Sequence, residues 1–98
     1  MPEAVFEPDR PPVVVKLSPL LVDLFPGSVR RVEMQADSVA AMVHELDRRW
    51  PGMGDRICDS RPAIRKHMNI FVDGERASLE TALAPGAEVF VLTAISGG

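Results

Sequence analysis

The hydrophobic and polar positions of the chain follow two periods, one typical of β-strands and one typical of an α-helix. Residues 13–17, 29–34 and 67–72 are rich in Val, Ile, Phe and Met, as strands are. The segment that begins at Glu88 is almost continuously apolar. Such a run is typical of a strand buried on both faces. We therefore predict that this last strand lies centrally in a sheet, parallel to the first strand.

One segment has the period of an amphipathic helix. Asp37 or Ser38 is suited to cap its N-terminus, and Pro51 ends it because the residue before a proline avoids the helical region. Five apolar side chains recur at the spacing of one helical face: Val39, Met42, Val43, Leu46 and Trp50. Because no other segment can bury this stripe, the helix is predicted to cover one face of the sheet.

Weaker patterns connect these elements. Residues 19–28 are predicted to form a loop, and residues 55–59 a short helical turn. The pair 73–74, Asp-Gly, is a strong signal for a hairpin turn, which residues 75–76 would follow as a brief edge strand. Leucines spaced four apart predict one more helical turn at residues 79–83.

The order of these elements predicts the fold. Two strands, a helix, a strand, a short strand, a turn and a last strand fit an α+β domain with a mixed sheet of four or five strands, crossed by one main helix. This is the β-grasp, or ubiquitin-like, arrangement. We expect the domain to span residues 13–98. Residues 1–12, which hold four of the nine prolines, are predicted to be a disordered or loosely attached extension.

Composition narrows the classes of partner. The formal net charge of the 98 residues is -3 and the pI is about 5.3, which argues against nucleic acid as the main partner. No apolar run approaches the length of a membrane span, and the N-terminus lacks the basic start and apolar stretch of a signal peptide. We therefore expect no membrane association and a cytoplasmic location.

The side chains that could carry chemistry are few. Cys58 is the single cysteine, so no internal disulfide can form. Two arginines and two aspartates lie within three residues of it, and their charges offset one another, so we expect an ordinary thiol. His44 and His67 have no second histidine at the i+4 position, so no metal site is expected. No acid, base and nucleophile occur together as in an enzyme.

The end of the sequence changes character after the last strand. Ser96 is small, and Gly97 and Gly98 have no side chain, so these residues can lie extended in a channel too narrow for a Cβ. The terminal carbonyl of Gly98 is then open to attack. A glycine pair alone could be accidental, but a pair directly after a core strand, at the end of a one-domain chain, favours a functional tail.

The helix capped near Asp37, residues 69–75 and residues 88–98 resemble the bacterial ubiquitin-like sulfur carriers of the MoaD/ThiS type. These are the small subunit of molybdopterin synthase and the sulfur carriers of thiamine and cysteine biosynthesis. The resemblance covers residues 13–98. It implies a protein that is not an enzyme and binds no cofactor itself. An E1-like adenylating enzyme, using ATP and magnesium, would activate the Gly98 carboxylate and convert it to a thiocarboxylate, and an acceptor synthase would then take the sulfur.

Two alternatives to the free carrier stay open. The chain could be the small subunit of molybdopterin synthase, or a ubiquitin-like modifier that forms isopeptide bonds to lysines. Residues 93–96 lack the proline of many molybdopterin-type carriers, which points away from that branch. Ala94 and Ile95 also differ from the arginines that precede the diglycine of ubiquitin, which makes a modifier of that type less expected.

The last strand has apolar residues on both of its faces. Val89 and Val91 point one way, and Phe90 and Leu92 point the other. Only one face can meet the helix. By analogy with ubiquitin we expect Phe90 and Leu92, together with Phe71, to form a partner interface on the open face of the sheet. The alternative is that long loops cover these side chains.

Overall fold

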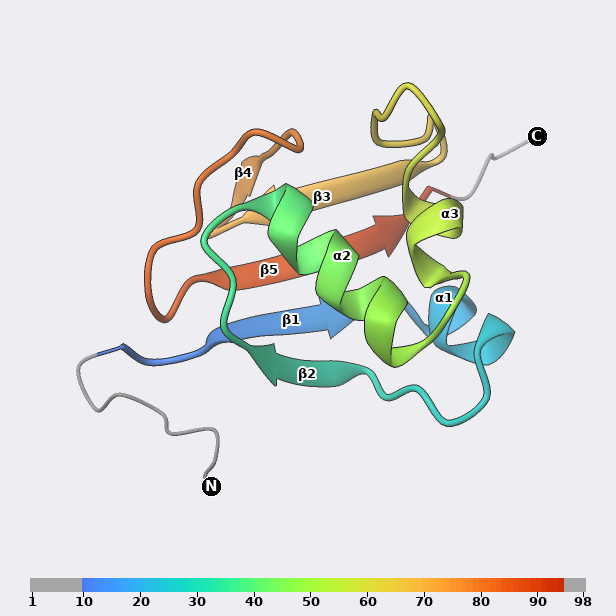
Figure 1. Cartoon of the computed structure of the whole chain (residues 1–98), viewed down its shortest axis with the longest axis horizontal. Coiled ribbons are helices and arrows are strands. Elements are labelled where there is room, and N and C mark those ends of the chain that lie inside the picture. Colours follow the sequence, from blue (N-terminus) through green and yellow to red (C-terminus); the bar gives the residue numbers. More distant parts are fainter. Residues whose placement is uncertain (1–9, 95–98) are drawn as a thin grey trace.

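One mixed sheet with three helices makes up the computed structural model, which describes residues 10–94 (Figure 1). The elements in chain order are β1 (Val13–Leu17), α1 (Pro19–Leu24), β2 (Arg31–Met34), α2 (Val39–Arg49), α3 (Met53–Ile57), β3 (Met68–Val72), β4 (Glu75–Arg76) and β5 (Glu88–Thr93). The strand order is β2-β1-β5-β3-β4. Strands β1 and β5 are parallel, and the other neighbouring pairs are antiparallel. The predicted β-grasp fold is confirmed.

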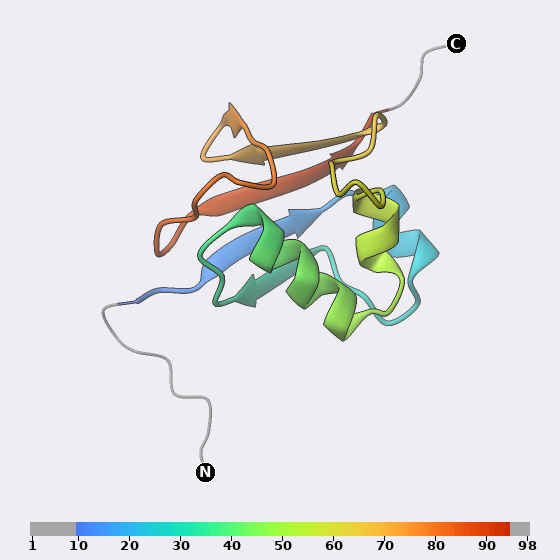
Figure 2. The same ribbon diagram turned by 45° about the horizontal axis from the view of Figure 1, so that its top comes forward.

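Strand β5 lies at the centre of the sheet. Val91 is the register partner of Leu17 on β1 and of Ile70 on β3. Val89 and Val91 are fully buried, because α2 crosses this face of the sheet (Figure 2). The continuous apolar pattern of the last strand therefore indicated its central position correctly. Its implied burial on both faces is wrong, because α2 covers only the face of Val89 and Val91, and Leu92 on the other face is 40% exposed.

Helix α2 has the predicted face and ends. Ser38, rather than Asp37, is the N-cap, and its hydroxyl accepts a hydrogen bond from the backbone nitrogen of Ala41 at 3.1 Å. The helix buries four of the five predicted residues, Val39, Met42, Val43 and Leu46. Trp50 is the C-cap and packs against the edge of the core while staying partly exposed.

The prediction that residues 19–28 form a loop is wrong in its first half, where α1 forms. The hydroxyl of Ser18 accepts a hydrogen bond from the backbone nitrogen of Leu21 at 3.2 Å, and Pro19 occupies the first turn. Leu21 is buried in the core. The cap and the proline were the available signals, since six residues are too few to show a helical period.

The prediction of a helical turn at residues 79–83 is also wrong. This segment runs beside the start of α2, and the carbonyl oxygens of Thr81 and Leu79 accept hydrogen bonds from the backbone nitrogens of Val39 (2.9 Å) and Ala40 (3.0 Å). The first N–H groups of any helix lack partners within the helix. Here residues 79 and 81 supply the partners, and Ala82 forms an isolated antiparallel bridge with Ser38, so the segment pairs with the start of α2 instead of forming a helix.

Helix α3 begins two residues before the predicted turn at residues 55–59. Its position depends on Asp47, whose Oδ1 accepts hydrogen bonds from the backbone nitrogens of Gly52 (3.1 Å) and Gly54 (2.9 Å). The other elements differ from prediction only at their ends, since β2 begins at residue 31 rather than 29 and β3 at residue 68 rather than 67.

Residues 1–9 of the predicted N-terminal extension lie outside the described residues, so its disorder stays a prediction. The carbonyl oxygen of Arg10 accepts a hydrogen bond from Nε2 of Gln35 at 3.2 Å, and that of Pro11 accepts one from the backbone nitrogen of Gly86 at 3.0 Å. Within residues 10–94, no helix is long and apolar enough to cross a membrane.

Candidate functional site: the tail root and the open face of the sheet

The predicted tail leaves the sheet from a firmly held point. The hydroxyl of Thr93, the last residue of β5, lies 2.8 Å from the hydroxyl of Ser18 at the end of β1. The backbone nitrogen of Ala94 donates a hydrogen bond to the carbonyl oxygen of His67 at 2.7 Å. The chain is therefore tied to both neighbouring strands where it leaves the sheet. Both contacts depend on register between distant segments, so the sequence did not indicate them.

The predicted site residues beyond this point are Ser96, Gly97 and Gly98. They lie outside the residues that the structure describes. Their roles stay predictions, and the structure bears on them only through the strand that precedes them.

The open face of the sheet brings the three predicted interface residues together. Phe90 on β5 is the direct register partner of Phe71 on β3. Both are partly exposed, and Leu92, two residues after Phe90 on the same face, is 40% exposed. Described loops therefore do not cover this face. We call Phe71, Phe90 and Leu92 the open-face patch; its use by a partner stays a prediction.

Charged side chains border the open-face patch. Lys16 on β1 is the register partner of Phe90, with its Nζ 5.3 Å from the centre of the phenyl ring and 2.8 Å from a carboxylate oxygen of Glu88. In the same row, Arg31 lies beyond Lys16 and Arg76 beyond Phe71. The patch is thus an apolar centre between charged ends, where Lys16 and Arg31 are ion-paired with Glu88 and Glu33. The sequence could not show this without the register.

Replacing Phe90 by Asp is expected to leave the domain folded and to weaken its binding to an activating enzyme. The reason is that Phe90 is only partly buried and faces away from α2. Val29→Asp is a matched control, since Val29 is 51% exposed and lies outside the patch. Thermal unfolding followed by circular dichroism and affinity measured by calorimetry test both variants. Equal affinities, or an unfolded Phe90 variant with a folded control, would count against the patch.

Cys58 is partly buried at the end of α3. Burial, reinforced by the carboxylate of Asp59, raises the pKa of its thiol above the usual value, and Arg65 opposes this only in part. Cys58 and His44 both line a hollow of about 270 Å³. Their spacing in the sequence did not indicate that they share it. A thiol with a raised pKa stays protonated near neutral pH and is a poor nucleophile.

Cys58→Ser is therefore expected to accept sulfur as well as the parent chain does. Serine keeps the size of the side chain and removes the thiol. Intact mass after loading measures the product directly. A folded Cys58 variant that no longer loads would make this thiol a participant in the chemistry.

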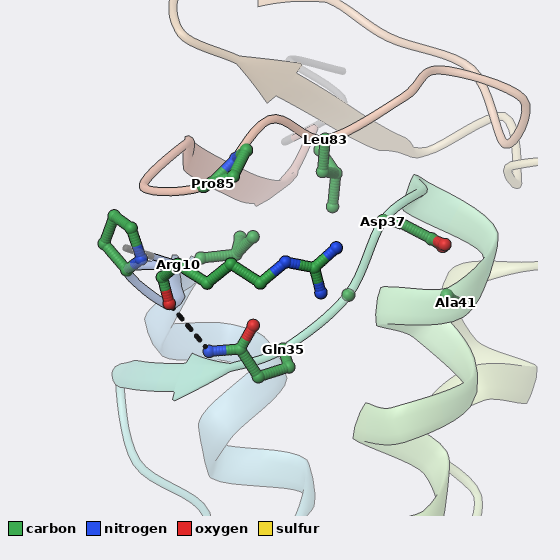
Figure 3. Close-up of a pocket in the computed structure, with 9 residues that line it drawn as sticks. Arg10, Gln35, Asp37, Ala41, Leu83 and Pro85 are labelled. Atoms are coloured by element: carbon green, nitrogen blue, oxygen red, sulfur yellow. Dashed lines mark hydrogen bonds between the residues drawn. The ribbon is translucent and has the colours of Figure 1, made fainter. Parts of the chain in front are cut away.

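A separate hollow of about 310 Å³ lies at the end of the sheet where β1 begins, opposite the end where β5 stops at Thr93 (Figure 3). The side chain of Arg10 extends into it between Gln35 and Leu83, and Asp37 lies at its far side. Within residues 10–94 no group of three or more histidine, cysteine or carboxylate side chains is arranged to hold a metal ion. Thr93 and Ala94, which we call the tail root, and the open-face patch remain the candidate site.

Comparison with known proteins finds similar chains of the same architecture. The model of the ThiS family matches residues 21–98. The sulfur carrier protein CysO of Mycobacterium tuberculosis is 31% identical over 78 residues, covering 74% of this chain and 84% of that protein. The crystal structure of SAMP1, small archaeal modifier protein 1, from Haloferax volcanii has a TM-score of 0.74 and 28% identity, covering 89% of this chain and 99% of that one. A chain from the BexX/CysO complex of Amycolatopsis orientalis has a TM-score of 0.78 and 22% identity, covering 88% and 99%.

Proposed function

Because the chain belongs to the ThiS family, within the ubiquitin-like sulfur carriers of the MoaD/ThiS type, we propose that it carries sulfur on the terminal carboxylate of Gly98. The observation that carries the proposal is the placement of β5. Thr93 at its end bonds to Ser18, and the next residue, Ala94, bonds to His67, two positions before the small residues at 96–98. A tail held at its root can enter a partner's active site while the domain docks outside.

The carboxylate needs activation before it can accept sulfur. A carboxylate oxygen is a poor leaving group, so an activating enzyme would transfer AMP from magnesium-bound ATP to the Gly98 carboxylate and release pyrophosphate. The terminal sulfur of a persulfide would then attack the carbonyl carbon, and AMP would leave. Cleavage of the S–S bond by another thiol, which becomes oxidised to a disulfide, leaves a thiocarboxylate on Gly98.

The chain's own part in this chemistry is presentation. Gly97 and Gly98 have no Cβ, so a narrow channel can admit them. Catalytic groups, ATP and magnesium would belong to the activating enzyme. The proposed role is therefore that of a carrier and co-substrate rather than a catalyst.

Two kinds of protein partner follow from this role: the E1-like adenylating enzyme and a synthase that accepts the sulfur. The solved complex of CysO with BexX from Amycolatopsis orientalis is a complex of a chain of this fold with another protein. We propose that the open-face patch makes the docking contact with the adenylating enzyme, because its apolar centre is exposed and free of described loops.

Adenylation is tested by pyrophosphate release. The chain is incubated with ATP, magnesium and the adenylating enzyme of its own organism, and the release that depends on the chain is measured. A chain whose C-terminal carboxylate has been amidated is the matched control. The proposal predicts release with the free carboxylate alone. Equal release from the amidated chain would contradict it.

A modifier role is the second candidate, and the likeness to SAMP1 of Haloferax volcanii favours it. In that role the activated Gly98 would form an isopeptide bond to a lysine of another protein. The two roles share the activation step and differ in the final product. A search for this chain's C-terminal peptide attached to lysines of other proteins would separate them.

A further inference from the structure

A groove of about 550 Å³ lies beside the point where the tail leaves the sheet. We call it the tail-root groove; it is lined mainly by Leu20, Leu24, Arg56, Arg65, His67 and Thr93. In Figures 1 and 2, helices α1 and α3 lie together at the end of the sheet where β1 and β5 stop. The groove thus brings together four segments that are distant in the sequence.

The wall that α1 contributes to the groove is apolar and exposed. Leu20 is 55% exposed and Leu24 is 48% exposed, while Leu21 between them is buried in the core. Residues four apart lie on one face of a helix, so these two side chains form a single surface. Exposed apolar surfaces with a polar rim are typical of protein interfaces.

The rim of the groove is basic although the whole chain is acidic. The guanidinium groups of Arg56 and Arg65 lie around it, against the single carboxylate of Asp55, and His67 lies beside them. Within residues 10–94 neither arginine takes part in an ion pair. Nε of Arg65 donates to the carbonyl oxygen of Asp55 at 2.6 Å, which leaves the charge of the guanidinium uncompensated. The complement to such a rim is a carboxylate-bearing segment.

The groove is continuous with the tail. Thr93 lines it, and the backbone nitrogen of the next residue, Ala94, donates a hydrogen bond to the carbonyl oxygen of His67, a rim residue. Side chains alternate along a strand, so Thr93 faces the groove side of the sheet while Leu92 faces the open-face patch. The two surfaces therefore lie on opposite faces of the sheet, next to the end of β5.

We propose that the tail-root groove is a second docking surface for the adenylating enzyme. Its occupant would be an acidic segment of that enzyme with one large apolar side chain, which packs on Leu20 and Leu24. The enzyme then holds the root of the tail from both sides of the sheet. This inference rests on the proposed function, because it names a partner that acts on Gly98.

The test compares kinetic constants for adenylation by the enzyme of the same organism. Leu20→Ser combined with Leu24→Ser removes the apolar wall, and Arg56→Gln removes one rim charge. Val29→Ser and Arg48→Gln are matched controls, since both residues are exposed and lie outside the groove. The double variant is expected to raise KM for the chain about tenfold with kcat unchanged. Arg56→Gln should raise KM less and weaken its dependence on salt, while the controls match the parent.

Circular dichroism first checks that each variant unfolds at the parent's temperature. If the leucine variant does not fold, Arg56→Gln with its salt dependence decides the question. Parent-like KM in folded groove variants would overturn this inference alone. A parent that is never adenylated would overturn both this inference and the proposed function. A fall in kcat without a change in KM, or self-association that the leucine variant loses, would show that another role or a second copy occupies the groove.

Discussion

Adding one residue after Gly98, or deleting Gly98, is expected to abolish adenylation while leaving the thermal unfolding of the domain unchanged. The enzyme must reach the terminal carbonyl carbon, and either change moves that atom out of register with the rest of the tail. Gly97→Val should fail as well, because a β-branched side chain widens and stiffens the segment. Stability should not change, because within residues 10–94 the last core residue is Val91 and the last residue of the sheet is Thr93.

Pyrophosphate release measures the loss of adenylation, and the unfolding temperature measures the unchanged stability. The same residue added before Met1 is the matched control and should behave like the parent. If the C-terminally extended chain is activated as well as the parent, and intact mass shows that no protease has trimmed it, the diglycine end is not the site.

Leu46→Ala is expected to lower the free energy of unfolding by about 2–5 kcal/mol. Leu46 is 0% exposed and lies on the buried face of α2, in the same core cluster as Val15, Ile70 and Val91. Removing its side chain takes apolar surface out of the core and leaves a cavity.

Urea denaturation measures this loss, with His44→Ala as the control on the exposed side of α2. The control should change stability by no more than about 0.5 kcal/mol. An unchanged midpoint for Leu46→Ala would contradict the assignment of this face to the core.

The sequence predicted the helices and strands whose apolar positions directly reflect which side chains are buried. Helix α2 buries a stripe long enough to show the helical period, and the apolar run of β5 indicated a strand with a paired strand on each side. The position of Phe90 on the open face followed from alternation along β5 once α2 was assigned to the other face.

The errors have two sources: a helix too short to show a period, and a segment whose structure depends on distant residues. Helix α1 is too short for a period and depends on the Ser18 cap. Residues 79–83 are not helical because they supply hydrogen-bond acceptors to α2, and no local pattern encodes that need. The tail-root groove has the same origin, since packing of α1 and α3 beside β5 brings its leucines and arginines together.

The role of Gly98 is the central claim, and the mass of the loaded chain tests it most directly. The chain is incubated with ATP, magnesium, its adenylating enzyme and a persulfide sulfur donor with a reducing thiol, and the intact protein and its C-terminal peptide are analysed by mass spectrometry. We predict one oxygen exchanged for sulfur, located on the C-terminal peptide and absent when ATP is omitted. An unmodified C-terminal peptide under conditions in which AMP is formed, or sulfur located at Cys58 instead, would contradict the account.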